Sequence, residues 1–174
     1  KIGNKQHSQE GLPPHFSIGP KNPINYSLIR NAIYRFADSI LGNTSEYQSA
    51  QDLLSRSIPR IKHRKSGEPI IATNDLLKAT KEAVINLDDS CLTIQGPPGT
   101  GKTYISSHVI VELLRQGKKV GISSNSHKAI HVILEKVEEI ALEQGFDFVG
   151  VKKASGNLPE TYYHGINKKN KFIF

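Results

Sequence analysis

Several residue types are scarce or missing in this 174-residue sequence. It has no tryptophan, no methionine even at its first position, and a single cysteine, Cys91. One cysteine excludes a disulfide within the chain and fits a reducing compartment, so we expect a cytoplasmic location and a small buried thiol. The missing initiator methionine predicts that the sequence is a segment of a longer chain.

Long apolar runs are also missing. No stretch approaches the roughly 18 apolar residues that a membrane helix needs, and no secretory signal is visible, so we expect no membrane partner. Positive charge is in excess, because 23 Lys and Arg face 16 Asp and Glu and give a net charge of +7. This balance favours an anionic partner such as nucleic acid, although a mildly basic soluble protein has the same composition.

The most informative segment is Gly-Pro-Pro-Gly-Thr-Gly-Lys-Thr at residues 96–103, a complete G-x-x-x-x-G-K-[ST] phosphate-binding loop. Such a loop needs a buried strand in front and a helix behind. The apolar run at 91–95 predicts the strand, and apolar residues at helical spacing over 104–116 predict the helix, with Gly117 as its stop. The alternative is a glycine-rich turn with a fortuitous Lys-Thr.

The eight loop residues share one expected function, which is to bind ATP and its Mg²⁺. They are Gly96, Pro97, Pro98, Gly99, Thr100, Gly101, Lys102 and Thr103. The glycines let the backbone approach the phosphates, the prolines stiffen it, and amides at the helix start bind phosphate oxygens. The expected catalytic groups are the Lys102 ammonium, which reaches the β- and γ-phosphates, and the Thr103 hydroxyl, a magnesium ligand.

The chain divides into three predicted regions. Residues 1–21, rich in Gly, Pro, His, Asn and Lys, predict an irregular N-terminal segment. Residues 22–72 predict a small helical region that ends in a basic connector at 60–67, which either contacts phosphates or is a solvated loop. Residues 73–174 predict the nucleotide-binding domain.

Apolar periodicity predicts the other elements. Helices are expected over 23–41, 46–56, 74–87 and 126–144. The first of them is amphipathic and should pack on another element, and Thr73 or Asn74 should cap the third. Further strands are expected at 118–124 and 146–151. Alternation of strands and helices predicts an α/β fold with a parallel sheet.

Residues 94–103 and 123–130 carry a resemblance to one family. They are similar to motifs I and Ia of superfamily 1 helicases, in the group that includes the Upf and Dna types. Residues 75–153 also resemble a bacterial subgroup in which the helicase core follows a RecB-like nuclease domain, and residues 25–60 resemble the helical region before that core. The resemblance implies a partial RecA-like P-loop NTPase domain, whose partners are the rest of the motor core and, in that subgroup, a fused nuclease.

The same resemblance implies that motif Ia grips the backbone of a single strand, with DNA favoured over RNA. The contact candidates are Ser124, Asn125, Ser126, His127 and Lys128. Hydroxyls, an amide and a lysine beside a helix start are usual phosphate partners, whereas plain helix capping by Ser126 or Asn125 is the alternative. His127 and His131 have the spacing of a metal pair, but we expect no metal site there.

The sequence departs from the family in three places. Residues 79–84 lack the Gln that reads the adenine edge, no acidic pair for magnesium follows Val151, and no arginine finger of a second motor domain is present. We therefore expect an ATP-binding segment of a translocase or helicase that, as 174 residues, binds nucleotide weakly and hydrolyses almost none. A non-catalytic nucleotide switch and an AAA-type ATPase are the alternatives.

Overall fold

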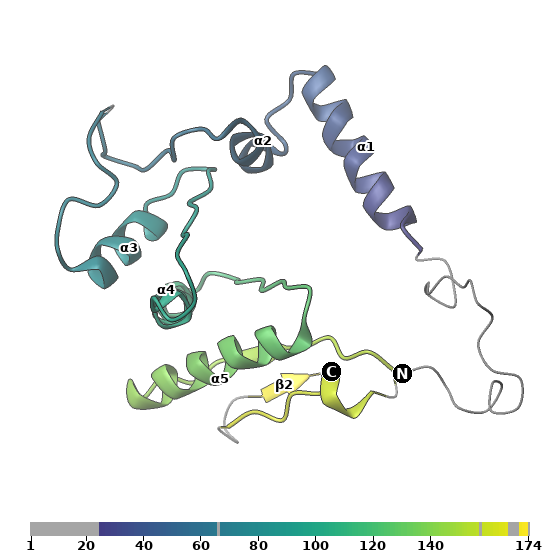
Figure 1. Ribbon diagram of the computed structural model, residues 1–174, viewed down its shortest axis with the longest axis vertical. Helices are drawn as coiled ribbons and strands as arrows, with labels where there is room; N and C mark the ends of the chain where they lie inside the picture. Colours follow the sequence, from purple (N-terminus) through teal and green to yellow (C-terminus); the bar gives the residue numbers. More distant parts are fainter. Residues whose placement is uncertain (1–24, 66, 157, 167–170, 174) are drawn as a thin grey trace, which may run out of the picture. The chain divides into compact units, whose positions relative to one another are not determined.

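The computed structural model describes residues 25–65, 67–156, 158–166 and 171–173. Within these ranges the chain forms five α-helices, one 3-10 helix and two short strands (Figure 1). Its backbone divides into two compact units, Lys1–Tyr47 and Gln48–Phe174. No helix in the described ranges has the length and apolar character needed to cross a bilayer.

The described part of the first unit is helix α1 (Ser27–Leu41) and the turn after it. The predicted stop is confirmed, because Gly42 is the C-cap: its N–H donates to the Asp38 carbonyl at 2.8 Å, and the next N–H, of Asn43, donates to the Ile40 carbonyl at 3.1 Å. The predicted start at Pro23 lies outside the described residues. On the apolar face of α1, Phe36 contacts the Tyr47 ring, with centroids 6.4 Å apart, whereas Leu28 is 82% exposed and Ile29 is exposed as well. Packing of this face on another element stays a prediction.

Helix α2 (Gln48–Ser55) opens the second unit and is tied to later segments by one carboxylate. Asp52 is only 3% exposed, and it accepts hydrogen bonds from Gln48 at 3.0 Å and Ser90 at 3.2 Å. The Asp52 carboxylate also forms an ion pair with Arg60, with 2.8 Å between Oδ2 and Nη1. Arg60 also donates to the carbonyl oxygen of Asp89, so α2 is fastened to the segment that leads into the phosphate loop.

The basic connector contacts the chain itself at its first residues. Ile61 forms an antiparallel bridge with Leu87, and the Lys62 N–H donates to the Asn86 carbonyl at 2.8 Å. This pairing places the connector beside the end of the following helix.

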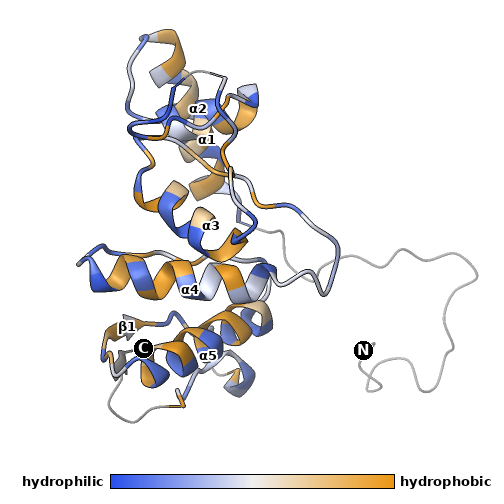
Figure 2. Ribbon diagram, turned by 90° about the vertical axis from the view of Figure 1, so that its left-hand side faces the viewer, coloured by the Kyte–Doolittle hydropathy of each residue, from blue (hydrophilic) through white to orange (hydrophobic). Residues whose placement is uncertain are grey.

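Three helices stack in the order α3 (Leu76–Ile85), α4 (Lys102–Arg115) and α5 (His127–Glu143), and Figure 2 shows apolar and polar residues alternating along them. The α4–α5 seam contains the core cluster of Val111, Val137, Ile140 and Ala141. The predicted cap of α3 was wrong by one or two residues. Asp75 is the N-cap, because its carboxylate accepts the Lys78 N–H at 3.0 Å.

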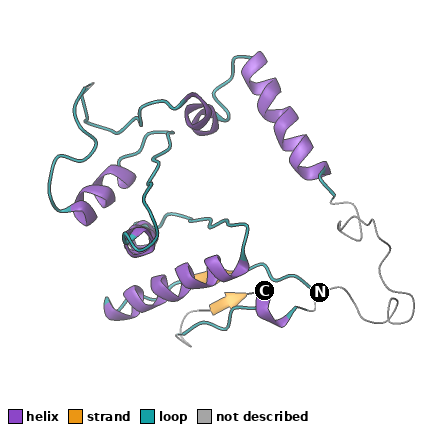
Figure 3. Cartoon of the chain, in the orientation of Figure 1, coloured by secondary structure: helices purple, strands orange, loops and turns teal. Residues whose placement is uncertain are grey.

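The parallel sheet is smaller than predicted. Strand β1 (Val149–Val151), inside the expected strand at 146–151, pairs in parallel with β2 (Lys171–Ile173), where no element was predicted. Segments 91–95 and 118–124 are loops (Figure 3). A strand exists only as part of a hydrogen-bonded ladder, and neither segment pairs with a strand among the described residues. The Lys118 N–H donates instead to the Leu113 carbonyl at the end of α4, at 3.0 Å.

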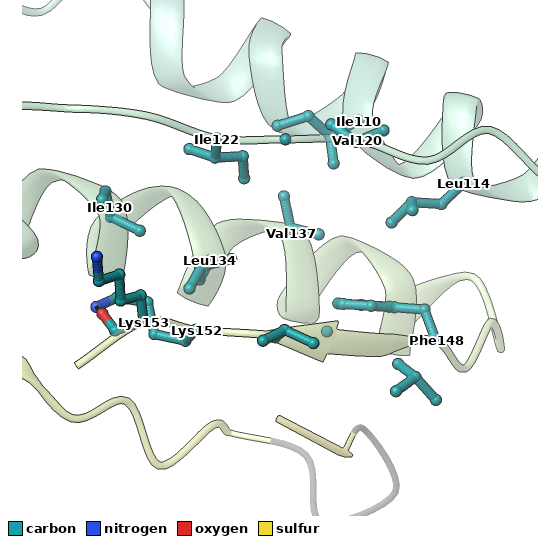
Figure 4. A pocket seen from close by; sticks show the side chains of 14 residues that line it. Ile110, Leu114, Val120, Ile122, Ile130, Leu134, Val137, Phe148, Lys152 and Lys153 are labelled. Carbon is teal, nitrogen blue, oxygen red and sulfur yellow. Dashed lines mark hydrogen bonds between the residues drawn. The ribbon is translucent and has the colours of Figure 1, made fainter. Parts of the chain in front are cut away.

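Hollows lie beside both of these loop segments. One of about 320 Å³ is lined by apolar side chains of α4, α5 and β1 together with Val120 and Ile122 (Figure 4). Another, of about 580 Å³, lies beside residues 91–95, where Cys91 is a free and half-buried thiol. The apolar side chains that predicted strands therefore do face space inside the unit.

We predict that Asp52→Asn destabilises the second unit in a pH-dependent way. The hydrogen bond from Gln48, followed by the contacts with Arg60 and Ser90, lowers the pKa of the Asp52 carboxyl. The folded-state pKa of Asp52 therefore lies below its unfolded-state pKa. At pH values above the unfolded-state pKa the network stabilises the fold, and this stabilisation is lost as pH falls through the folded-state pKa.

Thermal unfolding followed by circular dichroism at neutral and acidic pH checks this. The variant should melt lower than wild type at neutral pH, and the difference should shrink in acid. Asp147→Asn, the same change at an exposed position, is the matched control. Equal melting of Asp52→Asn and wild type at both pH values would show that Asp52 does not fasten α2.

Candidate nucleotide and nucleic-acid site

The phosphate loop joins residues 91–95 to α4 through two glycines in the left-handed region. Gly99 has a φ of 82° and Gly101 a φ of 80°, which residues with a side chain rarely adopt. Gly101 is the N-cap of α4, and its carbonyl accepts the Ile105 N–H at 3.0 Å. Because α4 begins at Lys102 and not at the predicted residue 104, the expected catalytic residues lie on its first turn, where helix amides are free to bind an anion.

The Lys102 ammonium lies across the loop. Its Nζ donates to the carbonyl oxygens of Gly96 at 2.6 Å and Pro97 at 2.7 Å, and approaches the Thr100 hydroxyl at 3.5 Å. The side chain is half-buried, whereas the neighbouring Thr103 is exposed. The loop backbone therefore holds one positive charge on its inner side and leaves one hydroxyl open beside it.

Thr100 braces the loop from within. Its hydroxyl donates to the Pro97 carbonyl at 2.9 Å. A Cβ built on Gly96 would lie 2.7 Å from the Thr100 Oγ1, closer than non-bonded atoms approach. Any larger residue at position 96 would therefore make the Thr100 hydroxyl turn away from this position.

These features fit a nucleoside triphosphate with magnesium. Glycines without side chains, amides at a helix start and an ammonium are the groups that bind a polyphosphate. The exposed Thr103 hydroxyl can ligate magnesium, which prefers oxygen ligands and binds phosphate oxygens as well. Residues 96–103 would hold both, and the magnesium would supply charge neutralisation when bound.

The expected nucleic-acid contacts begin in the loop before α5. Ser124, Asn125 and Ser126 are exposed. Ser126 is the N-cap by backbone position alone, because its side chain makes no capping hydrogen bond. The Ser124 hydroxyl accepts the Ser126 N–H at 3.4 Å. Side-chain capping by Ser126 is therefore not observed, and the polar side chains face outward.

His127, the first residue of α5, is held by two residues that sequence reasoning missed. Lys152 Nζ lies 2.9 Å from its Nδ1, and the hydroxyl of Ser155 lies 3.0 Å from its Nε2. Both ring nitrogens are thereby engaged within the chain, whereas Lys128 beside it is exposed. A lysine directly after an apolar strand carries no sequence signal for such a contact.

His131 does not join His127. Its ring packs on Tyr163 with centroids 5.3 Å apart. The Tyr163 hydroxyl donates to the buried Glu138 at 2.6 Å, and burial, followed by this hydrogen bond, raises the pKa of Tyr163. No group of three or more potential metal-binding side chains occurs within the described ranges, so the two histidines have no further ligand there.

A half-buried histidine lies on the second turn of α4. His108 of α4 packs edge-on against Tyr104, with ring centroids 4.5 Å apart. Burial, followed by the charge of Lys81, lowers the pKa of His108. The lowered pKa favours the neutral imidazole at this position of α4.

Comparison with known families gives a match over part of the chain. Residues 72–156 match the family described as "AAA domain". This range begins before α3 and ends after β1, so it contains the phosphate loop and all five motif Ia candidates.

Comparison with individual proteins gives a shorter match. Regulator of nonsense transcripts 1 of Dictyostelium discoideum is 47% identical over 53 residues, which are 29% of this chain and 4% of that protein. The chain thus spans a small part of this relative's length. No solved structure matches the chain. The two matches therefore say what part of the chain is similar to: residues 72–156 to the family described as "AAA domain", and a stretch of 53 residues to this regulator.

Proposed function

We propose that the chain is the ATP-binding segment of a nucleic-acid-dependent ATPase, a translocase or helicase of superfamily 1. The observation that carries the proposal is the phosphate loop at the start of α4, with Lys102 across its inner side. The exposed polar segment 124–126 at the start of the next helix supports the nucleic-acid part. Both features lie inside the range matched by the family.

ATP would bind by exchange of partners at the loop. The Lys102 ammonium would leave the carbonyls of Gly96 and Pro97 for the β- and γ-phosphate oxygens, to which it is attracted by charge. The amides from Gly99 to Thr103 would bind the remaining phosphate oxygens, and the Thr103 hydroxyl would ligate magnesium. Hydrolysis also requires groups that align water and neutralise charge, which lie outside residues 96–103.

A single nucleic-acid strand would be held by its backbone at the start of α5. Ser124, Asn125, Ser126 and Lys128 present exposed donors, whereas the His127 ring is engaged inside the chain. Backbone contacts of this kind do not select a base sequence. Because the matched relative is named for transcripts, RNA stands beside DNA as the proposed strand.

We predict that Lys102→Met strongly weakens nucleotide binding by the chain. Methionine keeps the length of the side chain but cannot donate to phosphate, so affinity for a fluorescent ATP analogue with Mg²⁺ should fall at least about tenfold. Lys118→Met, which removes the same charge from an exposed position beyond α4, should bind like wild type. Equal affinity of wild type and Lys102→Met would refute nucleotide binding at the loop.

We also predict that Gly96→Ala weakens nucleotide binding through its clash with Thr100. The Thr100 hydroxyl would have to turn away and lose its hydrogen bond to the Pro97 carbonyl, which costs about 0.5–1.5 kcal/mol, or roughly two- to tenfold in affinity. Thr100→Ala removes the clashing oxygen, so the double variant should bind like Thr100→Ala alone. Titration of the three variants measures this, and additive losses would contradict the proposed brace.

If Lys128 binds a phosphate of the strand, Lys128→Met should change how affinity for the strand depends on salt concentration. A lysine that neutralises one phosphate contributes about one unit to the slope of log affinity against log salt concentration, so the variant should bind a single-stranded oligonucleotide more weakly and with a shallower slope. Fluorescence anisotropy over a salt series measures both. An unchanged slope would place the contact elsewhere.

A further inference from the structure

A buried lysine lies directly behind the proposed nucleic-acid segment. Lys152 follows β1 and is 5% exposed. Figure 4 places it with Lys153 at the Ile130 end of the apolar hollow, away from Phe148. Burial of an ammonium is costly unless every one of its protons finds an acceptor.

The three protons of this ammonium have three acceptors. Lys152 Nζ donates to the carbonyls of Lys153 at 2.7 Å and Thr161 at 3.1 Å, and its third partner is His127 Nδ1 at 2.9 Å. None of these partners is a carboxylate. Each N–H of the Lys152 ammonium therefore has an acceptor, but no negative group neutralises its positive charge.

The contact also specifies the protonation of the His127 ring. An ammonium has donors only, so Nδ1 must accept and the ring proton must sit on Nε2. Nε2 then donates to the Ser155 hydroxyl at 3.0 Å. Ser155 is held from its other side as well, because its N–H donates to the Thr161 hydroxyl at 2.9 Å.

One chain of contacts thus runs from the 3-10 helix at Pro159–Thr161 through Lys152 to the first residue of α5. His127 directly follows the exposed residues Ser124, Asn125 and Ser126. The two contacts of its ring tie the first turn of α5 to the segment that follows β1.

We propose that Lys152 is a positioning residue for nucleic-acid binding. It acts through His127, holding the start of α5 so that residues 124–126 and Lys128 face the strand together. Lys152 itself is buried and does not touch the nucleic acid. This inference rests on the proposed function, in which a strand binds at the start of α5.

The first test reads the His127 ring directly. Two-dimensional ¹H–¹⁵N NMR of the imidazole, in mildly alkaline buffer, should show the Nε2–H tautomer in the wild-type chain. Lys152→Met removes the donor to Nδ1 and should shift the ring toward a mixture of tautomers. An Nδ1–H tautomer in wild type, or no change in the variant, would overturn the contact on which the proposal stands.

The second test asks whether the contact matters for binding. The probes are fluorescein-labelled single-stranded oligodeoxythymidine and oligouridine, and the variants are Lys152→Met, His127→Ala and their combination. Each single change should weaken binding about fivefold, and the double variant should bind no worse than either, because both break one link. The slope against salt should stay at the wild-type value, since no phosphate contact is removed.

Affinity for the fluorescent ATP analogue controls for folding and should be unchanged in all three variants. His127→Ala leaves Lys152 in place and gives the same information if Lys152→Met fails to fold. Additive losses, or wild-type affinity in Lys152→Met, would overturn the positioning role alone. A wild-type chain that binds neither oligonucleotide would overturn the proposed nucleic-acid function and this inference with it, whatever the NMR result.

Discussion

The turn made by Gly99 and Gly101 is the constraint on which the second unit depends. Their φ angles of 82° and 80° turn the chain directly from the phosphate loop into α4 at Lys102. That turn brings the lysine ammonium back over the carbonyls of Gly96 and Pro97. It also aims α4 between α3 and α5, so the same two glycines set the nucleotide loop and the central helix of the core.

Buried charged groups then hold the segments that a sheet would otherwise organise. Asp52 fastens α2 to residues 60 and 90, Glu138 accepts from Tyr163 and the Ile166 N–H, and Lys152 joins His127 to Thr161. Each of them bridges elements far apart in the sequence. Buried polar groups with every partner in place fix a particular arrangement, because loss of one partner leaves a costly unpaired charge.

The sequence predicts what is local in this molecule. Glycines mark the ends of α1 and α4, and the spacing of apolar residues predicts α3 and α5 to within two residues. The motif at 96–103 predicts a tight glycine turn before a helix, and Gly99 and Gly101 make that turn, whereas the strand expected at 91–95 is a loop and α4 begins two residues earlier than predicted. The cap of α3 was misplaced, since Thr73, Asn74 and Asp75 are all good caps and the choice depends on which oxygen reaches the Lys78 N–H.

What depends on distant partners was not predicted. The apolar runs at 91–95 and 118–124 have the composition of strands, yet a ladder requires a second backbone segment that composition does not specify. The pairing of β1 with β2 joins residues some twenty apart, for the same reason. Lys152 was missed because a lysine is expected in solvent unless the fold supplies acceptors on every side.

The central claim is that residues 96–103 bind a triphosphate and the start of α5 binds a strand. Hydrogen exchange followed by mass spectrometry tests both parts in one chain. MgATP should slow exchange of the amides from Gly99 to Ile105, and a single-stranded oligonucleotide should separately slow exchange over residues 124–128. Unchanged exchange of the loop amides at saturating MgATP would contradict the account at its base.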